Sequence, residues 1–147
     1  VPAISVHVAF AWLCRQLAKE GAVTQRAVPS ILDQKVPNSQ RAETGTLYAS
    51  FATFHCPDYC DEPNESCTVT GEVREANLFD VLRNIELGGY LNFVVRSHQL
   101  APGVGGYRLS VLWRLLEEAR SSEKNILVAT ACRCHGVIDA LRWESTR

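Results

Sequence analysis

Residues 91–131 read LNFVVRSHQLAPGVGGYRLSVLWRLLEEARSSEKNILVATA, and this stretch decides the expected fold. It begins with an apolar run at residues 91–96 and ends with a second one at residues 125–131. The residues between the two runs place an apolar stripe along one side of a helix, formed by Leu109, Val111, Leu112, Leu115 and Leu116. Two continuous apolar strands joined by an amphipathic helix are typical of a parallel β–α–β unit.

Other segments extend this alternation in both directions. Apolar spacing predicts a helix over residues 5–20, and Asn77 is placed to cap a second helix that continues to residue 85. Residues 46–55, TLYASFATFH, are rich in β-branched and aromatic residues and predict a strand. A final helix is expected from Val137, carrying Ile138, Leu141 and Trp143. The sequence therefore predicts a single α/β domain over residues 1–147, with a mostly parallel sheet between two layers of helices, Rossmann-like or flavodoxin-like.

Composition narrows the class of protein. With 147 residues, 46% of them hydrophobic and 21% charged, the chain can form an ordinary globular core. A net charge of -1 offers no field for nucleic acid, and no apolar run reaches the roughly 18 residues of a membrane-spanning helix. We expect a cytoplasmic protein without nucleic-acid or membrane partners. The chain opens at Val1 and lacks methionine, which is consistent with a fragment whose N-terminal domain is missing.

Five of the six cysteines follow two predicted strands. Cys14 lies inside the first predicted helix, where we expect it to act as a small buried apolar side chain. The remaining thiols and a neighbouring imidazole fall at the carboxyl ends of the strands at 46–55 and 125–131, and they are Cys56, Cys60, Cys67, Cys132, Cys134 and His135. Carboxyl ends of parallel strands meet at one edge of a sheet, where ligands bind. We expect these six residues to form one site.

Thiolates and imidazoles at short spacings are the ligands that zinc or an iron–sulfur cluster requires. The sequence therefore predicts a metal-binding domain with zinc as the favoured metal and an iron–sulfur cluster as the alternative. Neither Cys132-Arg-Cys134-His135 nor Cys56-Pro-Asp-Tyr-Cys60 has the spacing of a haem attachment site or a thioredoxin pair. A disulfide framework and a redox-active thiol site remain as alternatives.

Two further features favour an enzyme or a sensor as second readings. His98 follows the strand at residues 91–96, where its imidazole could serve as a catalytic acid, a catalytic base or a further metal ligand. In the enzyme reading, Cys56 or Cys132 is the nucleophile next to it. The glycines expected between this strand and the next helix could hold a small anionic ligand such as phosphate or carboxylate, and they are Gly103, Gly105 and Gly106. An anion- or nucleotide-sensing module is the third reading.

The segments FHCPDYCDEPNESCTVTGE, RSHQLAPGVGGYR and ATACRCHGVIDAL resemble a group of uncharacterised bacterial proteins. In that group a cysteine-rich carboxyl half follows a nucleotide-binding, Rossmann-like amino half. The resemblance implies that the six cysteine and histidine residues belong together, and that Val1-Pro2-Ala3 follow a further domain. It implies no reaction.

Overall fold

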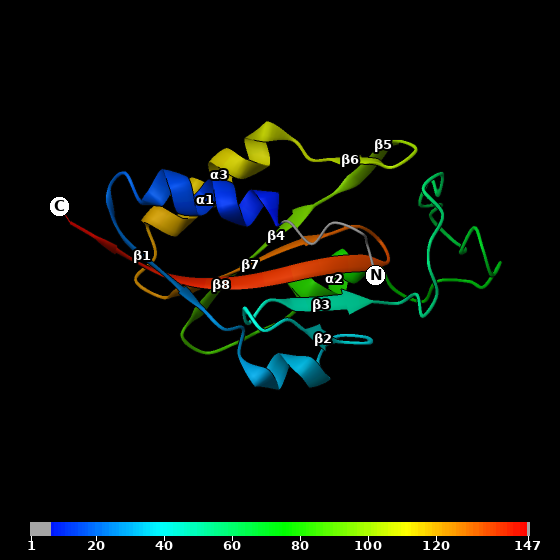
Figure 1. Cartoon of the computed structure of the whole chain (residues 1–147), viewed down its shortest axis with the longest axis horizontal. Coiled ribbons are helices and arrows are strands. Elements are labelled where there is room, and N and C mark those ends of the chain that lie inside the picture. The colour runs from blue at the N-terminus through cyan, green and yellow to red at the C-terminus, as the bar shows by residue number, and fades with distance from the viewer. Residues whose placement is uncertain (1–6, 147) are drawn as a thin grey trace.

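The helices and strands lie within residues 7–146, the part of the chain that the computed structural model describes. Figure 1 labels them in chain order: α1 (Val8–Leu17), β1 (Gly21–Arg26), a 3-10 helix (Ser30–Gln34), β2 (Gln40–Arg41), β3 (Leu47–Ser50), α2 (Leu78–Arg83), β4 (Tyr90–Arg96), β5 (His98–Ala101), β6 (Val104–Gly106), α3 (Leu109–Arg120), β7 (Asn125–Ala131) and β8 (His135–Ser145). The resemblance's expectation for residues 1–3 lies outside the described residues.

The β–α–β unit predicted from residues 91–131 is present. Strands β4 and β7 pair in parallel over their full lengths, from Tyr90 opposite Asn125 to Arg96 opposite Ala131, and α3 connects them. The glycine-containing segment before α3 forms a separate β5–β6 hairpin instead of a simple turn. The chain thus inserts a projecting hairpin between the strand and the helix of the unit.

Strand β8 determines the rest of the sheet. It is antiparallel to β7 on one side, and on the other side it is antiparallel to β3 near its start and to β1 near its end. Strand β2 extends the sheet beyond β3. Among the described residues, the β4–β7 pair is the sheet's only parallel pair.

The expected Rossmann-like or flavodoxin-like fold with a mostly parallel sheet is therefore wrong. The sheet is mixed, and strands occupy more of the described chain than helices do. The segment expected to be the last helix is β8, and it is a strand because residues 132–134 reverse the chain too tightly for a crossover. Since β8 has neighbours on both sides and buries Ile138, Leu141 and Trp143, its apolar pattern resembles that of a buried helix.

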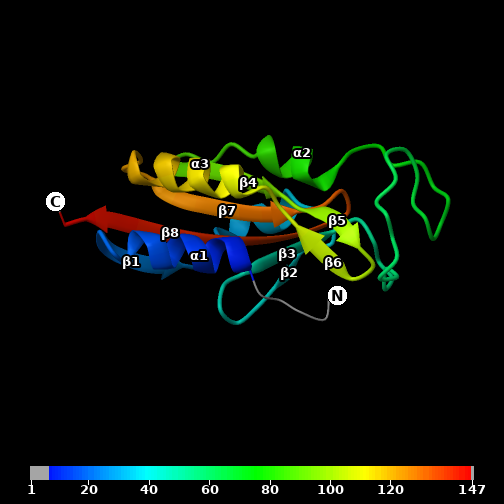
Figure 2. The same ribbon diagram turned by 90° about the horizontal axis from the view of Figure 1, so that it is seen from above.

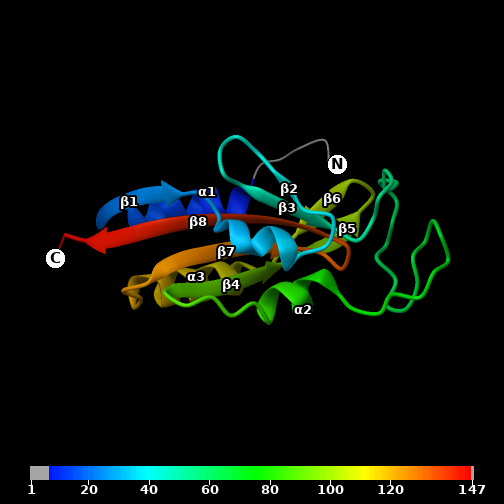
Figure 3. The same cartoon turned by 90° about the horizontal axis from the view of Figure 1, so that it is seen from below.

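Each face of the sheet has its own apolar core. Helices α1 and α3 pack on one face of the sheet, as seen from above in Figure 2. On that face Leu13, Leu115 and Val128 belong to one buried cluster. Helix α2 and the 3-10 helix cover the other face, seen from below in Figure 3, with Leu32 and Leu82 in the second cluster. Cys14 packs against the first cluster, as expected for a small apolar side chain.

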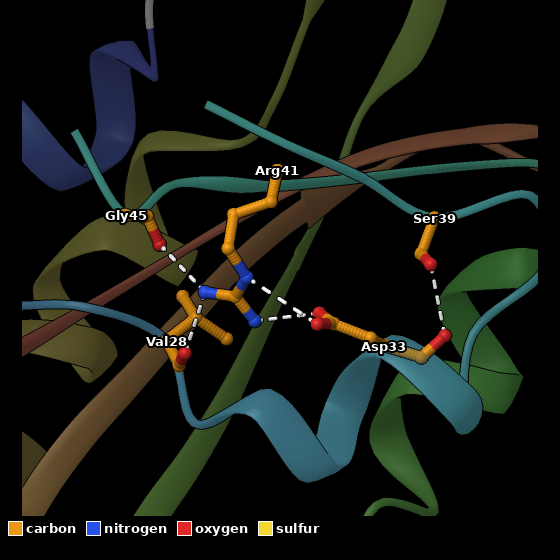
Figure 4. A network of polar contacts seen from close by, with 5 residues as sticks. All are labelled: Val28, Asp33, Ser39, Arg41 and Gly45. Carbon is orange, nitrogen blue, oxygen red and sulfur yellow. Dashed lines mark hydrogen bonds and ion pairs between the residues drawn. The ribbon is translucent and has the colours of Figure 1, made fainter. Parts of the chain in front are cut away.

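Arg41 fixes the chain segment that leads from β1 to β3 (Figure 4). Its guanidinium donates hydrogen bonds to the Val28 carbonyl at 2.6 Å and the Gly45 carbonyl at 3.3 Å, and it forms an ion pair with Asp33 at 2.5 Å. One side chain thereby holds the strand exit, the 3-10 helix and the β2–β3 turn together. Within residues 7–146, no helix is long and apolar enough to cross a bilayer.

Candidate functional site

The turn between β7 and β8 presents two thiols and an imidazole at one end of the sheet. The amide of Cys132 donates to the His135 carbonyl at 2.9 Å, which closes the turn. The amides of Cys134 and His135 donate in turn to the Cys132 sulfur, at 3.4 and 3.2 Å. Atom Nδ1 of His135 lies 3.7 Å from the same sulfur. The Cys132 thiol is therefore held by its own turn.

Two neighbouring segments fix the position of this turn through backbone hydrogen bonds. The amide of Phe51, just after β3, donates to the Cys134 carbonyl at 2.8 Å. The amide of Leu78, at the start of α2, donates to the Arg133 carbonyl at 2.8 Å. A strand of the sheet and a helix that covers it thus converge on the segment that carries Cys132 and Cys134.

A long loop between β3 and α2 carries the other three thiols. It extends from the same end of the molecule as the β5–β6 hairpin in all three ribbon views (Figures 1, 2 and 3). The Cys60 amide donates to the Pro57 carbonyl at 3.1 Å, and the Cys67 amide donates to the Glu72 carbonyl at 2.8 Å. The loop is therefore built from short hydrogen-bonded turns around its cysteines.

The loop and the β7–β8 turn enclose one pocket of about 540 Å³. The thiols and imidazole predicted as a site all line this pocket, and they are Cys56, Cys60, Cys67, Cys132, Cys134 and His135. The β5–β6 hairpin forms another part of the wall, because the Gly103 amide and the Gln99 side chain donate to the Asp58 carbonyl at 2.8 and 2.9 Å. Glu62 and Arg74 add charged groups to the lining.

Burial and mutual repulsion raise the pKa of several of these thiols. Burial raises the pKa of Cys132 to about 12, and the Glu62 carboxylate acts in the same direction. Burial also raises the pKa of Cys56, with further contributions from Cys60, Cys134 and Cys67. Thiolates that repel one another in this way lie close enough to share one electrostatic environment.

Cys67 differs from these thiols. Hydrogen bonds from the Thr70 amide and hydroxyl and from the Val69 amide lower the pKa of Cys67, and they outweigh the opposing effect of its burial. Burial lowers the pKa of His135, so its imidazole is held in the neutral form that binds metals. Burial raises the pKa of Cys134, although Arg74 opposes this shift through a hydrogen bond and its charge.

Two of the predicted site features are placed differently. His98 is exposed on β5 and does not line the pocket, so its imidazole does not share the pocket with any of the thiols. Gly103 and Gly105 line the pocket but Gly106 does not, and all three belong to a hairpin and not to a strand-to-helix turn. The Gly103 amide is also already bonded to Asp58.

The pocket contains separate thiols. All six cysteines are free, so the disulfide framework is absent. Within residues 7–146, no three Cys, His, Asp or Glu side chains already converge closely enough to hold a metal ion. A metal would have to draw the loop's thiols toward the β7–β8 turn.

A buried polar chain on the sheet was not predicted. His7 lies between Asp139 and Thr130, with its Nδ1 2.9 Å from Asp139 Oδ2 and its Nε2 2.9 Å from Thr130 Oγ1. Thr46 donates to the other Asp139 oxygen at 2.6 Å. The single signal in the sequence is Asp139 itself, a carboxylate within the apolar run of β8.

Comparison with known proteins identifies a family. A profile described as "Uncharacterized protein, C-terminal domain" matches residues 9–144. An uncharacterized protein of the archaeon Archaeoglobus fulgidus is 39% identical over 87 residues, which are 59% of this chain and 38% of that protein. No solved structure matches the chain. The resemblance to a C-terminal domain is thereby confirmed. Because the profile covers nearly the whole chain, the chain belongs to the family of this uncharacterized C-terminal domain.

Proposed function

We propose that this domain binds a metal ion through the thiols of its pocket, with zinc as the first candidate. The observation that carries the proposal is the gathering of five thiols and one imidazole, from two distant segments, around a single pocket. Zinc takes four thiolate or imidazole ligands in structural sites, and an iron–sulfur cluster takes four thiolates. The pocket offers enough ligands for either.

Amide hydrogen bonds to sulfur support the proposal. Cys132 accepts from the amides two and three residues after it, and Cys67 accepts from Val69 and Thr70 in the same relative positions. Such bonds stabilise a thiolate, which is the form that binds a metal. Two turns of this kind therefore present sulfur atoms to the same pocket.

A cation would also relieve repulsion within the pocket. Cys56, Cys60, Cys67 and Cys134 act on one another electrostatically, so ionising one thiol makes the next harder to ionise. A divalent ion removes that penalty and binds the thiolates together. The loop that carries three of the thiols contains no helix and, apart from a bridge between Ser66 and Val73, no strand pairing, so it is less constrained than the sheet against movement toward the β7–β8 turn.

The test is metal content measured on anaerobically purified protein, with single Cys→Ser variants. We expect one zinc per chain. We expect Cys67→Ser and Cys134→Ser to weaken zinc binding by more than the 10- to 100-fold that loss of an outer-shell partner costs. Cys14→Ser is the matched control, because Cys14 lies on α1, packs against the first core cluster and does not line the pocket, so its replacement should leave zinc binding unchanged.

The outcomes separate clearly. Iron with inorganic sulfide, lost in the same variants, would replace zinc by a cluster on the same thiols. A protein that takes up neither metal, or that keeps one zinc per chain when Cys67 and Cys134 are both replaced, would overturn the proposal.

A second candidate function is thiol chemistry at Cys67. Its lowered pKa is the property of a reactive thiol, whereas the raised pKa values of Cys56 and Cys132 make these two poor nucleophiles. Chelation distinguishes the two functions, because a metal-held Cys67 becomes reactive only after the metal is removed.

A further inference from the structure

Three arginine side chains surround one phenyl ring beside the thiol pocket. The guanidinium carbon of Arg96 lies 4.0 Å from the centre of the Phe79 ring, that of Arg83 lies 5.1 Å away, and that of Arg133 lies 5.9 Å away. The three come from the end of β4, from α2 and from the β7–β8 turn. Separate elements therefore bring three positive charges to one apolar surface.

The cluster has few anionic partners of its own. Arg83 forms an ion pair with Asp80 at 3.1 Å, while Arg133 donates only to the neutral side-chain oxygens of Asn77, at 2.7 Å, and Asn64. The side chain of Arg96 makes no hydrogen bond or ion pair within residues 7–146. The Nε atoms of Arg96 and Arg133 are both buried and, in the same part of the chain, have no hydrogen-bond partner.

Three guanidinium groups in the cluster face two nearby carboxylates. Burial lowers the pKa of Arg96, and the charges of Arg133 and Arg83 lower it further. Glu62 and Asp80 act against this shift, but within residues 7–146 neither forms an ion pair with Arg96. Unpaired donors and uncancelled positive charge are the conditions in which an external anion binds.

We propose that Arg83, Arg96 and Arg133 form a binding site for a phosphate group beside the thiol pocket. A tetrahedral oxyanion offers several acceptor oxygens at once, so it can accept from guanidinium groups that approach from different elements. The Phe79 ring lies against the Arg96 guanidinium in a cation–π contact and shields that side of it from water. This site is made of different residues from the proposed metal ligands.

The test is titration of the full chain with inorganic phosphate at constant ionic strength, with chloride as the balancing anion. Arginine Nε–H signals are followed by NMR. We expect saturable shifts of the Arg96 and Arg133 signals, and at least tenfold weaker binding in Arg96→Gln. The matched control is Arg114→Gln, because Arg114 also lies over a phenyl ring, that of Phe93 at 5.4 Å, but on α3 and paired with Glu118.

Several results would overturn the proposal. These are shifts with phosphate no larger than those with chloride, equal weakening in Arg96→Gln and Arg114→Gln, or saturable binding of acetate without binding of phosphate. Arg83→Gln provides a second variant whose change lies at the exposed side of the cluster, in case Arg96→Gln does not fold. Zinc content is measured on the same samples, so that loss of phosphate binding with zinc retained is distinguished from failure of the metal site.

Discussion

Cys67 and Cys132 receive similar backbone hydrogen bonds but differ in acidity. The amides two and three residues after each cysteine point at its sulfur. At Cys132, removal from water outweighs these bonds and raises the pKa to about 12. At Cys67 burial opposes the bonds from Thr70 and Val69 more weakly, so these bonds lower its pKa. Burial, and not turn geometry, therefore decides which thiol ionises first.

This difference predicts the order of chemical modification. In metal-free protein at neutral pH, Cys67 should be alkylated by iodoacetamide before Cys56 and Cys132, since the thiolate is the reacting form. Peptide mass spectrometry at successive times measures the order. Cys14 is the internal control and should react late, because burial raises its pKa to about 11. Modification of Cys132 ahead of Cys67 would contradict the assignment.

The grouping of the cysteines could be predicted from sequence although the sheet could not. The prediction used only the carboxyl ends of β3 and β7, and these two strands run in the same direction because both are antiparallel to β8, which lies between them. The carboxyl ends of β3 and β7 therefore lie at one edge of the sheet, although β8 was expected to be a helix. His98 could not be placed, because β5 turns away into a hairpin and exposes its side chain.

At the scale of elements, the sequence predicted those segments whose apolar pattern is typical of either a strand or a helix, but not of both. Strand β7 was predicted with its exact bounds, since an apolar run with buried residues on both faces is unambiguous when a helix precedes it. Strand β8 was missed because Ala140 and Leu141 are both buried on opposite faces, a pattern that a buried helix also gives. The sequence pattern did not indicate the tight turn at Cys132–Cys134, which would have identified the next segment as an antiparallel strand.

The buried network around Asp139 connects α1 to the sheet, and its removal should be costly. Asp139→Ala leaves His7 and Thr46 without their acceptor in a largely buried place, so we expect a loss of about 2–3 kcal/mol in the free energy of unfolding. Urea denaturation followed by tryptophan fluorescence measures it. Glu118→Ala, which removes an exposed pair with Arg114, should change stability by no more than about 0.5 kcal/mol. Equal losses in the two variants would show that the network does not hold α1.

At the scale of the whole molecule, buried thiols should make stability depend on alkaline pH. The folded state keeps Cys14 protonated up to about pH 11 and Cys132 up to about pH 12, from an ordinary pKa of 9.0. The unfolded state therefore binds fewer protons in this range, and the free energy of unfolding of metal-free protein should fall as pH rises from 9 to 12.

Chemical denaturation at several pH values checks this expectation. Cys14→Ala should flatten the decline between pH 9 and 11 and leave the part between pH 11 and 12 that belongs to Cys132. Identical slopes in Cys14→Ala and the unchanged protein would rule out Cys14 as a source of the dependence.

The long strand β8 also constrains when the molecule can form during synthesis. Both β1 and β3 join the sheet through β8 alone, yet they are made more than eighty residues earlier. Until residues 135–145 have left the ribosome, β1 has no strand partner, β3 can pair only with β2, and the β7–β8 turn has not been closed against its neighbours. The nascent chain must therefore keep β1 and the β2–β3 pair apart from the rest of the sheet, and accessible to chaperones and proteases, until β8 has been made.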